Sequence, residues 1–429
     1  MTQTEPGPSA EERASDRTAL RVVAAYAACV VAAGLLIDSP AEVLRGLGAI
    51  ILSRDTLVTD YIGVGGMGAA FVNAGLLTLA ASFVYWRSGA RVNGPAVACL
   101  FLVLGFGLFG KNLLNVWFGV LGVLAYSRLS RQAFAKNINA AFFGAALGPV
   151  FSEIVFSTAL PLHWSLPLGV ATSALMGFIL VPVANRLFHA HEGYCLYNIG
   201  FTAGIVGSIV VALYRSYGFV SEPVFIWTTG NNGLLSALLF ASFVSFVLAG
   251  LRLDREAPKK LRLLMRDVGQ APSDFVGSYG MGATMINMGL TGVIATGYVL
   301  LVRGDLNGPT IGAILSVVGF SAAGKHPRNI VPIMVGVFIG TVAKPWSADE
   351  PSLVLAALFG TNLAPIAGRF GWFWGIVTGF VHSSVAQNVG DLHGGLVLYN
   401  NGFAAGMVAA VLTPVILALH RPPRRPPDG

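Results

Sequence analysis

Several polar side chains of this sequence lie among apolar residues, where each needs a hydrogen-bonding or charged partner. A lysine ammonium at membrane depth is costly and marks a candidate functional site. Asparagine and tyrosine can exchange hydrogen bonds with a small solute. Most of these side chains occupy equivalent positions in two repeats, so the chain offers the same chemistry twice. The candidates for a substrate pathway are Met67, Asn73, Lys111, Tyr197 and Asn198 in the first repeat, and Met281, Thr284, Asn287, Lys325, Tyr399 and Asn400 in the second.

Each candidate also has a purely structural interpretation. Lys111 and Lys325 can snorkel from short interfacial loops, and Asn73 and Asn287 can hydrogen-bond neighbouring helices. The two methionines can form a flexible constriction or fill the core. The two Tyr-Asn pairs can anchor the membrane interface or line a solute-binding mouth. The sequence leaves these alternatives open.

An internal duplication positions the candidates. The stretch at 60–76 recurs at 274–290 without a gap, and the same register continues through an Asn-Gly-Pro, a Gly-Phe and a Gly-Lys match. A later Leu-Tyr-Asn-x-Gly-Phe motif also occurs twice. Each half has about 200 residues, the size of a domain. We therefore divide the chain into a disordered leader (1–18), two membrane repeats (19–222 and 223–420) and a basic tail (421–429).

The composition places the chain in a lipid bilayer. Hydrophobic residues make up 55% of it and charged residues 11%, with a mean hydropathy of +0.70. This leaves too little polar surface to solvate a globule of this size. The net charge of +7 comes from basic residues at the ends of apolar runs, as in membrane proteins, which excludes nucleic acid as a partner. The three cysteines have no close cysteine or histidine partner, which excludes a disulfide framework or a zinc site.

The apolar runs predict seven membrane segments in each half. The connector at 38–59 carries more acid than base, whereas its counterpart at 251–270 is strongly basic. Equivalent connectors of opposite charge belong on opposite sides of a membrane, so the repeats should be inverted relative to each other. We expect an all-α, polytopic integral membrane protein of the bacterial cytoplasmic membrane, with two tandem homologous halves and with both termini in the cytoplasm.

Several of these segments are too short to cross a membrane. A perpendicular helix needs ~20 residues, and the runs that meet at 109–112 and at 323–326 are shorter. We therefore predict broken or re-entrant helices, which usually line a cavity. Because an inverted duplication maps one wall of a pathway onto the other, we expect Asn73 and Asn287 to face each other across the pseudo-twofold axis.

The order of elements resembles that of urea transporters. The shared features are a polar Asn near an apolar run, an Asn-Gly-Pro break, paired short spans, a Phe-Gly break and a late aromatic-rich helix, all occurring twice. The chain also resembles a bacterial membrane family of duplicated domains with no assigned function. The first resemblance implies an inverted repeat that conducts a small solute, and the second implies no particular chemistry.

These features predict a transporter rather than an enzyme. We expect a channel-like facilitator or weakly coupled carrier for a small polar or neutral solute, without a cofactor and able to form a homo-oligomer. No acid lies inside a span in both halves, as a duplicated carboxylate relay would require, and no hydrolase or phosphate-loop motif is present in a suitable context. The alternative is a structural or redox subunit of a larger complex, because Gly282-Ala283-Thr284 resembles the end of the flavin-attachment motif of membrane redox subunits.

Overall fold

The computed structural model describes residues 9–157, 160–220 and 224–420, and it is almost entirely helical. The first half contains α1 (Ala10–Ile37), α2 (Pro40–Ile51), α3 (Tyr61–Gly65), α4 (Met67–Ser88), α5 (Gly94–Phe106), α6 (Val116–Leu129), α7 (Phe134–Gly144), the 3-10 turn η1 (Ala145–Leu147), α8 (Gly148–Phe156), α9 (Leu162–His191) and α10 (Asn198–Ser216). A two-residue parallel pair joins β1 (Val58–Thr59) to β2 (Phe225–Ile226), which lies at the start of the second half.

The second half repeats the same order. It contains α11 (Asn232–Leu253), α12 (Ala257–Leu264), α13 (Phe275–Leu301), α14 (Gly308–Phe320), α15 (Pro327–Ala343), α16 (Pro351–Gly360), the 3-10 turn η2 (Thr361–Leu363), α17 (Ala364–Phe370), α18 (Trp372–Asn388), the 3-10 turn η3 (Gly390–His393) and α19 (Asn400–Leu419). A kink at Gly280, with φ 80°, marks in α13 the place where Gly66 separates α3 from α4.

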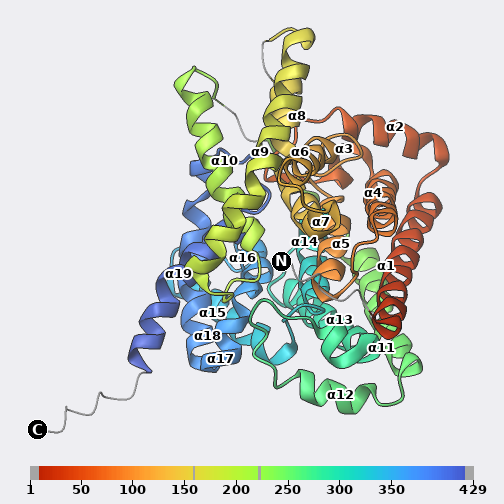
Figure 1. The fold of residues 1–429 in the computed structure, drawn as a ribbon, viewed down its shortest axis with the longest axis vertical. Helices are drawn as coiled ribbons and strands as arrows, with labels where there is room; N and C mark the ends of the chain where they lie inside the picture. Colours follow the sequence, from red (N-terminus) through yellow and green to blue (C-terminus); the bar gives the residue numbers. More distant parts are fainter. Residues whose placement is uncertain (1–8, 158–159, 221–223, 421–429) are drawn as a thin grey trace, which may run out of the picture.

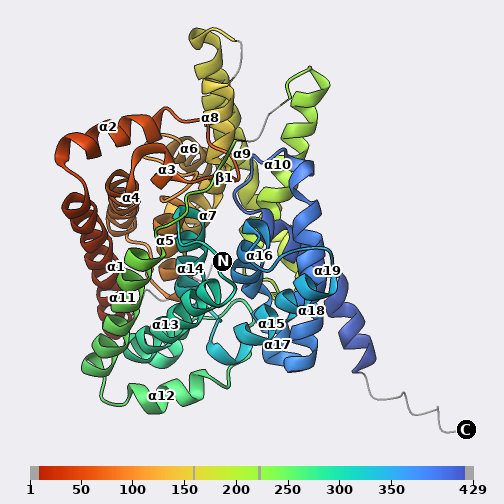
Figure 2. The ribbon, with the colours of Figure 1, turned by 180° about the vertical axis from the view of Figure 1, so that it is seen from behind.

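The helices confirm the predicted fold class. Within the described residues, nine helical stretches are long and apolar enough to cross a membrane, and four further apolar helices are shorter. Figure 1 places α2 in the upper part of the molecule and its counterpart α12 at the bottom, and Figure 2 shows the same arrangement from behind. The equivalent connectors therefore lie at opposite ends, as expected for an inverted repeat.

The first helix begins earlier than predicted. We expected a disordered leader to residue 18, but α1 starts at Ala10. The reason is a capping box, in which the Ser9 side chain accepts a hydrogen bond from the Glu12 backbone and the Glu12 carboxylate accepts one from the Ser9 backbone. Glu12 and Asp16 also pair with Arg91. Residues 1–8 and the predicted basic tail at 421–429 lie outside the described residues.

Two short helices, α5 and α14, form the core of the molecule. Each has 13 residues, which gives a length of about 20 Å, less than the ~30 Å hydrocarbon layer. Almost all of their side chains are buried, so they face protein rather than lipid. They pack tightly, since a Cβ added to Gly105 would lie 2.7 Å from the Gly312 carbonyl oxygen.

The two repeats cap each other's core helix. The Asp60 carboxylate accepts a hydrogen bond from Ile62 N at 3.0 Å, in its own repeat, and another from Gly308 N at 3.1 Å, the first residue of α14. The Asp274 carboxylate likewise accepts one from Gly277 N at 2.9 Å and one from Gly94 N at 2.8 Å, the first residue of α5. Each aspartate thus caps a helix of its own repeat and the core helix of the other repeat, because α5 and α14 run antiparallel.

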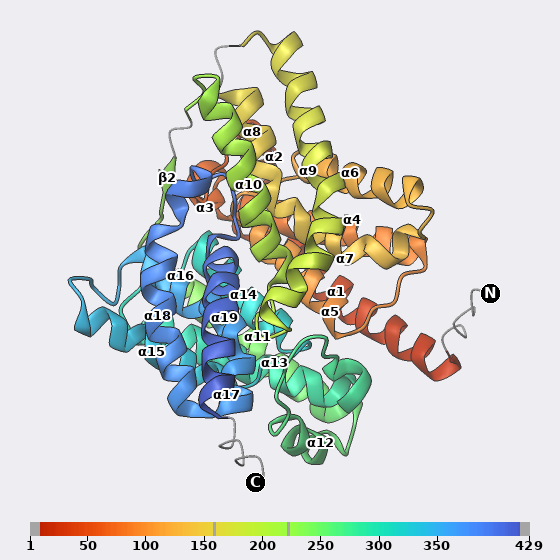
Figure 3. The same ribbon diagram turned by 60° about the vertical axis from the view of Figure 1, so that its left-hand side comes forward.

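The last long helices of the two repeats meet at their N-termini. A Cβ added to Gly200, in the first turn of α10, would lie 3.2 Å from the Cα of Gly402, in the first turn of α19. From this meeting point α10 runs up and α19 runs down in Figure 3. The Leu196 N–H donates to the Asn362 carbonyl in η2 at 2.9 Å, and the Leu398 N–H donates to the Ala146 carbonyl in η1 at 3.2 Å. The N-termini of α10 and α19 are therefore fixed by the breaks of the opposite repeat.

Candidate solute-binding site

The two lysines follow matching breaks in the backbone. Gly110, with φ 77°, ends the turn after α5, and Gly324, with φ 128°, ends the turn after α14. A residue with a side chain is strained in this left-handed region, so glycine permits both breaks. Lys111 and Lys325 come next, and both side chains are completely buried. The predicted breaks are confirmed, but the lysines do not snorkel to an interface.

The ammonium of Lys111 lies among a carbonyl and two aromatic rings. Its Nζ donates to the Phe142 carbonyl oxygen at 3.1 Å. It also lies 5.2 Å from the centre of the Phe106 ring and 5.5 Å from the centre of the Tyr399 ring. Both rings are within range of a cation–π interaction. A lysine of the first repeat is thus covered by a tyrosine of the second.

Lys325 has the reciprocal surroundings. Its Nζ donates to the Tyr197 hydroxyl at 2.9 Å and lies 4.6 Å from the centre of that ring. The centre of the Phe320 ring is 5.2 Å away. Among the described residues, no carboxylate oxygen lies within 4.0 Å of either ammonium. Two buried lysine side chains therefore have aromatic rings and neutral oxygens as neighbours.

Six rings contributed by both repeats form an aromatic centre between the lysines. The centroids of Tyr197 and Tyr399 are 6.4 Å apart, and neighbouring pairs in the group lie 4.5 to 5.7 Å apart. These distances are typical of favourable ring contacts. The aromatic centre consists of Phe106, Phe143, Tyr197, Phe320, Phe359 and Tyr399.

The hydroxyls of the two central tyrosines differ. Tyr197 hydrogen-bonds Ser316 on α14 as well as Lys325. Leu102 occupies the position in α5 that is equivalent to Ser316. Tyr399 consequently has no such partner, and its buried hydroxyl makes no hydrogen bond to any described residue. A buried hydroxyl without a partner is costly.

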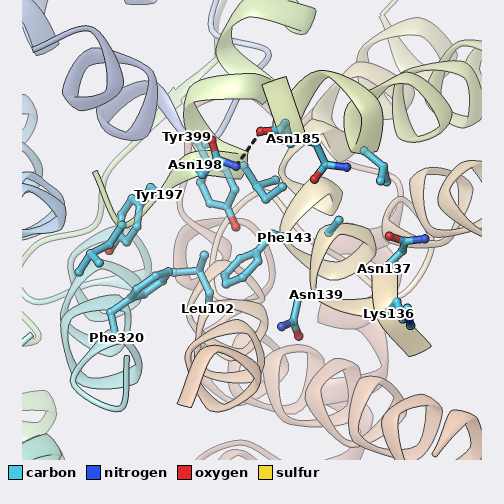
Figure 4. Close-up of a pocket in the computed structure, with 16 residues that line it drawn as sticks. Leu102, Lys136, Asn137, Asn139, Phe143, Asn185, Tyr197, Asn198, Phe320 and Tyr399 are labelled. Carbon is cyan, nitrogen blue, oxygen red and sulfur yellow. Dashed lines mark hydrogen bonds between the residues drawn. The ribbon is translucent and has the colours of Figure 1, made fainter. Parts of the chain in front are cut away.

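A cavity of about 260 Å³ leads to the aromatic centre. We call this cavity the vestibule. Figure 4 shows Tyr197, Phe320 and Tyr399 on one side of it and several amides on the other. These three rings also contact the lysine side-chain nitrogens. They therefore separate the vestibule from Lys111 and Lys325. Its lining residues with polar side chains are Lys136, Asn137, Asn139, Asn185, Asn198, Tyr197 and Tyr399.

The equivalent surface of the second repeat is closed. Leu355 replaces Asn139 and is 5% exposed, and Ala356 replaces Ala140 and is fully buried. At the counterpart of the mouth, the Gln387 amide donates to the Ser352 hydroxyl at 2.9 Å and joins α18 to α16. The two repeats therefore differ in how far their surfaces open toward the same centre.

The two Tyr-Asn pairs divide their roles. The Asn198 amide donates to the Ala184 carbonyl at 3.1 Å, and its oxygen lies 3.0 Å from His191 Nε2. Asn400 repeats this arrangement with the Ala386 carbonyl, at 2.9 Å, and with the ring of His393. The asparagines thus hold the starts of α10 and α19 against the preceding helices, while the tyrosines reach the aromatic centre.

Asn73 and Asn287 do not face each other as predicted. The Asn73 amide donates to the Gly107 carbonyl at 2.7 Å and to the Lys111 carbonyl at 3.0 Å, and its oxygen accepts from Leu113 N at 3.2 Å. The Asn287 amide donates to the carbonyls of Ser321 and Lys325, both at 2.8 Å. Each asparagine therefore clamps the backbone break of its own repeat, because that break leaves carbonyls unpaired.

We accordingly expect Asn73→Leu to act on stability. Removal of three buried hydrogen bonds should lower the free energy of unfolding by roughly 3 kcal/mol. Asn287→Leu should cost less, because the Asn287 side-chain oxygen has no partner among the described residues. Thermal unfolding of the purified variants in detergent measures both changes. Equal unfolding midpoints for the wild type and the Asn73 variant would contradict this role.

The remaining candidates lie away from the aromatic centre. Met281 packs in the core, and Met67 is partly buried against the same core. Thr284 is buried, and its hydroxyl donates to the Gly280 carbonyl at 2.9 Å. These contacts match the core-filling interpretation of the methionines.

Sequence reasoning did not single out a buried acid beside the first break. Asp55 lies in the connector between α2 and β1, outside the spanning helices, and accepts hydrogen bonds from Tyr61, Asn112, Asn115 and Ser152 at 2.7 to 3.1 Å. Burial raises the pKa of Asp55 to about 7. Asp55 thereby fastens the chain that follows Lys111. The second repeat has glycine at this position, so the duplication gave no signal for it.

Other residues could have been found from the repeat. Phe106 and Phe320 are identical partners that precede the two Gly-Lys breaks, and that match was the available signal. Ser316 and the vestibule residues Asn137, Asn139 and Asn185 have no identical counterparts, so the duplication could not point to them.

The fold and the site define a polytopic membrane protein in which two inverted repeats enclose a lysine and aromatic centre. The chain belongs to the family DUF1576, described as a protein of unknown function, which matches residues 39–216 and 253–418. The two matched stretches fall in the two repeats, which agrees with the predicted membership of a duplicated family. No curated protein and no solved structure matches the chain, and the resemblance to urea transporters is not confirmed.

Proposed function

We propose that the protein transports a small polar solute across the membrane through the aromatic centre. The observation that carries this proposal is the vestibule, which ends on Tyr197 and Tyr399, one from each inverted repeat. In inverted repeats, substrate sites lie at the interface of the repeats and are built from broken helices. The aromatic centre has both properties.

The unequal surfaces of the repeats favour a carrier over an open channel. Alternating access requires that one repeat opens toward the shared site while the other is closed. Asn137 and Asn139 line the vestibule, whereas Leu353 and Leu355 are buried at the equivalent positions. A transport cycle would open the second surface by separating α16 from α18, where Ser352 and Gln387 are hydrogen-bonded.

The basic connector gives the orientation that we propose. The basic residues of this connector lie at the end of α11, between the two helices and on α12; they are Arg252, Arg255, Lys259, Lys260 and Arg262. Figure 1 shows the C-terminal end of α19 at the same end of the molecule. By the positive-inside rule this end faces the cytoplasm, together with both termini.

Solute flux into vesicles tests the proposed function. The purified full-length protein, reconstituted into phospholipid vesicles, should carry at least one solute from a panel of urea, acetamide, glycerol, chloride and nitrate faster than protein-free vesicles do. Ala140→Trp should remove that flux because it fills the vestibule, in which Ala140 lies. Leu36→Trp is the matched control, since Leu36 is 87% exposed on α1 and outside the vestibule.

Two results would overturn this proposal. One is the absence of flux for the whole panel by a well-folded protein. The other is undiminished flux by the Ala140 variant, which would place the pathway elsewhere.

A further inference from the structure

We propose that the aromatic centre binds a small anion between Lys111 and Lys325, and that this anion is the transported solute. The inference rests on the proposed function, which it makes specific for a class of substrate. It draws on the two ammonium groups, on an unpartnered hydroxyl and on the direction of two helices.

The charge of the site has one sign. Both ammonium groups are fully buried, and the described residues place no carboxylate within 4.0 Å of either. A buried charge without an opposite charge is strongly unfavourable. The aromatic faces and the Phe142 carbonyl offset part of this cost. An anion held between the lysines would supply the missing counter-charge.

The hydroxyl of Tyr399 is an unused hydrogen-bond donor at the same place. It is buried and makes no hydrogen bond to any described residue. The Tyr399 ring lies 5.5 Å from Lys111 Nζ and also lines the vestibule. A phenol can donate to an anion without being ionised. The hydroxyl therefore provides a neutral ligand beside a charged one.

Two helix N-termini point at the aromatic centre. The first N–H groups of a helix have no acceptor within the helix, and they carry a partial positive charge. α10 and α19 begin directly after Tyr197 and Tyr399 and diverge from the contact between Gly200 and Gly402 (Figure 3). Both helix dipoles thus add to the field of the lysines.

The lining of the vestibule also favours an anion. Lys136 and four asparagines are among its polar lining residues, and the lining contains no aspartate or glutamate. A cleft lined by one sign of charge attracts solutes of the opposite sign. A neutral solute would need only the amides and hydroxyls, and it would leave both ammonium groups without a counter-charge. A cationic solute would be repelled.

Nitrate binding to the purified full-length protein tests the inference. The protein is kept in detergent with a large organic anion as the only counter-ion, and nitrate is then added. A ligand that binds the folded state raises its unfolding temperature. We expect nitrate to raise the unfolding midpoint of the wild type and to leave that of Lys111→Met and Lys325→Met unchanged. Lys259→Met is the matched control, because Lys259 lies on α12 with its side chain 81% exposed, and it should behave as the wild type.

The lysine variants are expected to fold. Replacing a buried charge that lacks an opposite charge by an apolar side chain of similar length leaves no buried ion behind. The unfolding midpoint without nitrate should therefore be equal to or higher than that of the wild type. Tyr399→Phe, which removes only one hydroxyl, should weaken nitrate binding roughly tenfold.

The outcomes separate this inference from the proposed function. The anion site would be overturned if nitrate raised the unfolding midpoint of Lys111→Met, Lys325→Met and Tyr399→Phe as much as that of the Lys259→Met control. It would also be overturned if nitrate had no effect on the wild type. If vesicles then carried urea or acetamide, the proposed transport function would stand with a neutral substrate. Nitrate binding that depends on both lysines, without flux of any solute, would support the anion site and overturn transport.

Discussion

Gly94→Ala is expected to lower the free energy of unfolding by about 2 to 4 kcal/mol, through overpacking and the loss of a helix cap. An added Cβ would lie 2.0 Å from the Ala322 carbonyl oxygen and 2.9 Å from an Asp274 carboxylate oxygen. The first contact is with backbone just after the end of α14 and cannot be relieved by a change of rotamer. The start of α5 must then move away from Asp274, which holds its N-terminus.

Gly297→Ala is the matched control for this prediction. Gly297 lies in the spanning helix α13, and a Cβ added there would meet no atom within 4 Å. The control should be neutral or should gain up to about 1 kcal/mol of helix propensity. Thermal unfolding in detergent compares the two variants. A Gly94 variant as stable as the Gly297 variant would show that the crossing of α5 and α14 can relax.

A cysteine at Ala140 is expected to react with a bulky water-soluble thiol reagent, whereas one at Ala356 should remain unmodified. The two alanines are equivalent in the repeats, but Ala140 lines the vestibule and Ala356 has no exposed surface. Cys29, which is exposed, is first replaced by serine, while Cys99 and Cys195 are buried. The readout is the mass of the labelled protein.

The same labelling also tests the transport pathway. Modification at Ala140 should stop the flux of any solute that the protein carries, because the reagent fills the vestibule. Equal labelling of both cysteines would contradict the one-sided opening. Complete labelling at Ala140 without loss of flux would separate the vestibule from the pathway.

The sequence predicted the elements well because their signals are local or repeated. Apolar runs, the Asn-Gly-Pro breaks and the Gly-Lys breaks each act within a few residues, and the duplication allowed each of these to be checked against a second copy. The lysines at 111 and 325 were recognised as candidates for the same reason. Their burial was not predicted, because the local sequence of a short loop that contains a lysine does not show whether the loop lies at the membrane interface or in the protein core.

The tyrosine partners of the lysines could not be predicted, because they come from the opposite repeat. Lys111 meets Tyr399, and Lys325 meets Tyr197, only because α10 and α19 meet at their N-termini. The prediction that Asn73 and Asn287 face each other was wrong for a related reason. Asn73 clamps carbonyls 34 and 38 residues later, and Asn287 uses the same two separations. These equal separations arise from the tertiary structure, and they can be recognised only when the positions of the backbone breaks in space are known.

The asymmetry of the repeats was present in the sequence but was not used. Asn137 and Asn139 in the first repeat correspond to Leu353 and Leu355 in the second. Identities between the copies, on which the predictions rested, identify only what the halves share. A carrier that opens on one side is distinguished by the positions at which its halves differ.

The exchanged aspartate caps have a consequence for biosynthesis and for ancestry. Asp274 holds the first residue of α5, so in the first half α5 lacks this second cap, beside that of Asn93, until the second half has been inserted. Because the core consists of one helix from each half, we expect each half to finish folding only against the other half. Before the gene was duplicated, the aspartate of one copy would have had to cap the core helix of a second copy of the chain. The ancestral chain would have had to insert in both orientations and to pair with an upside-down copy of itself.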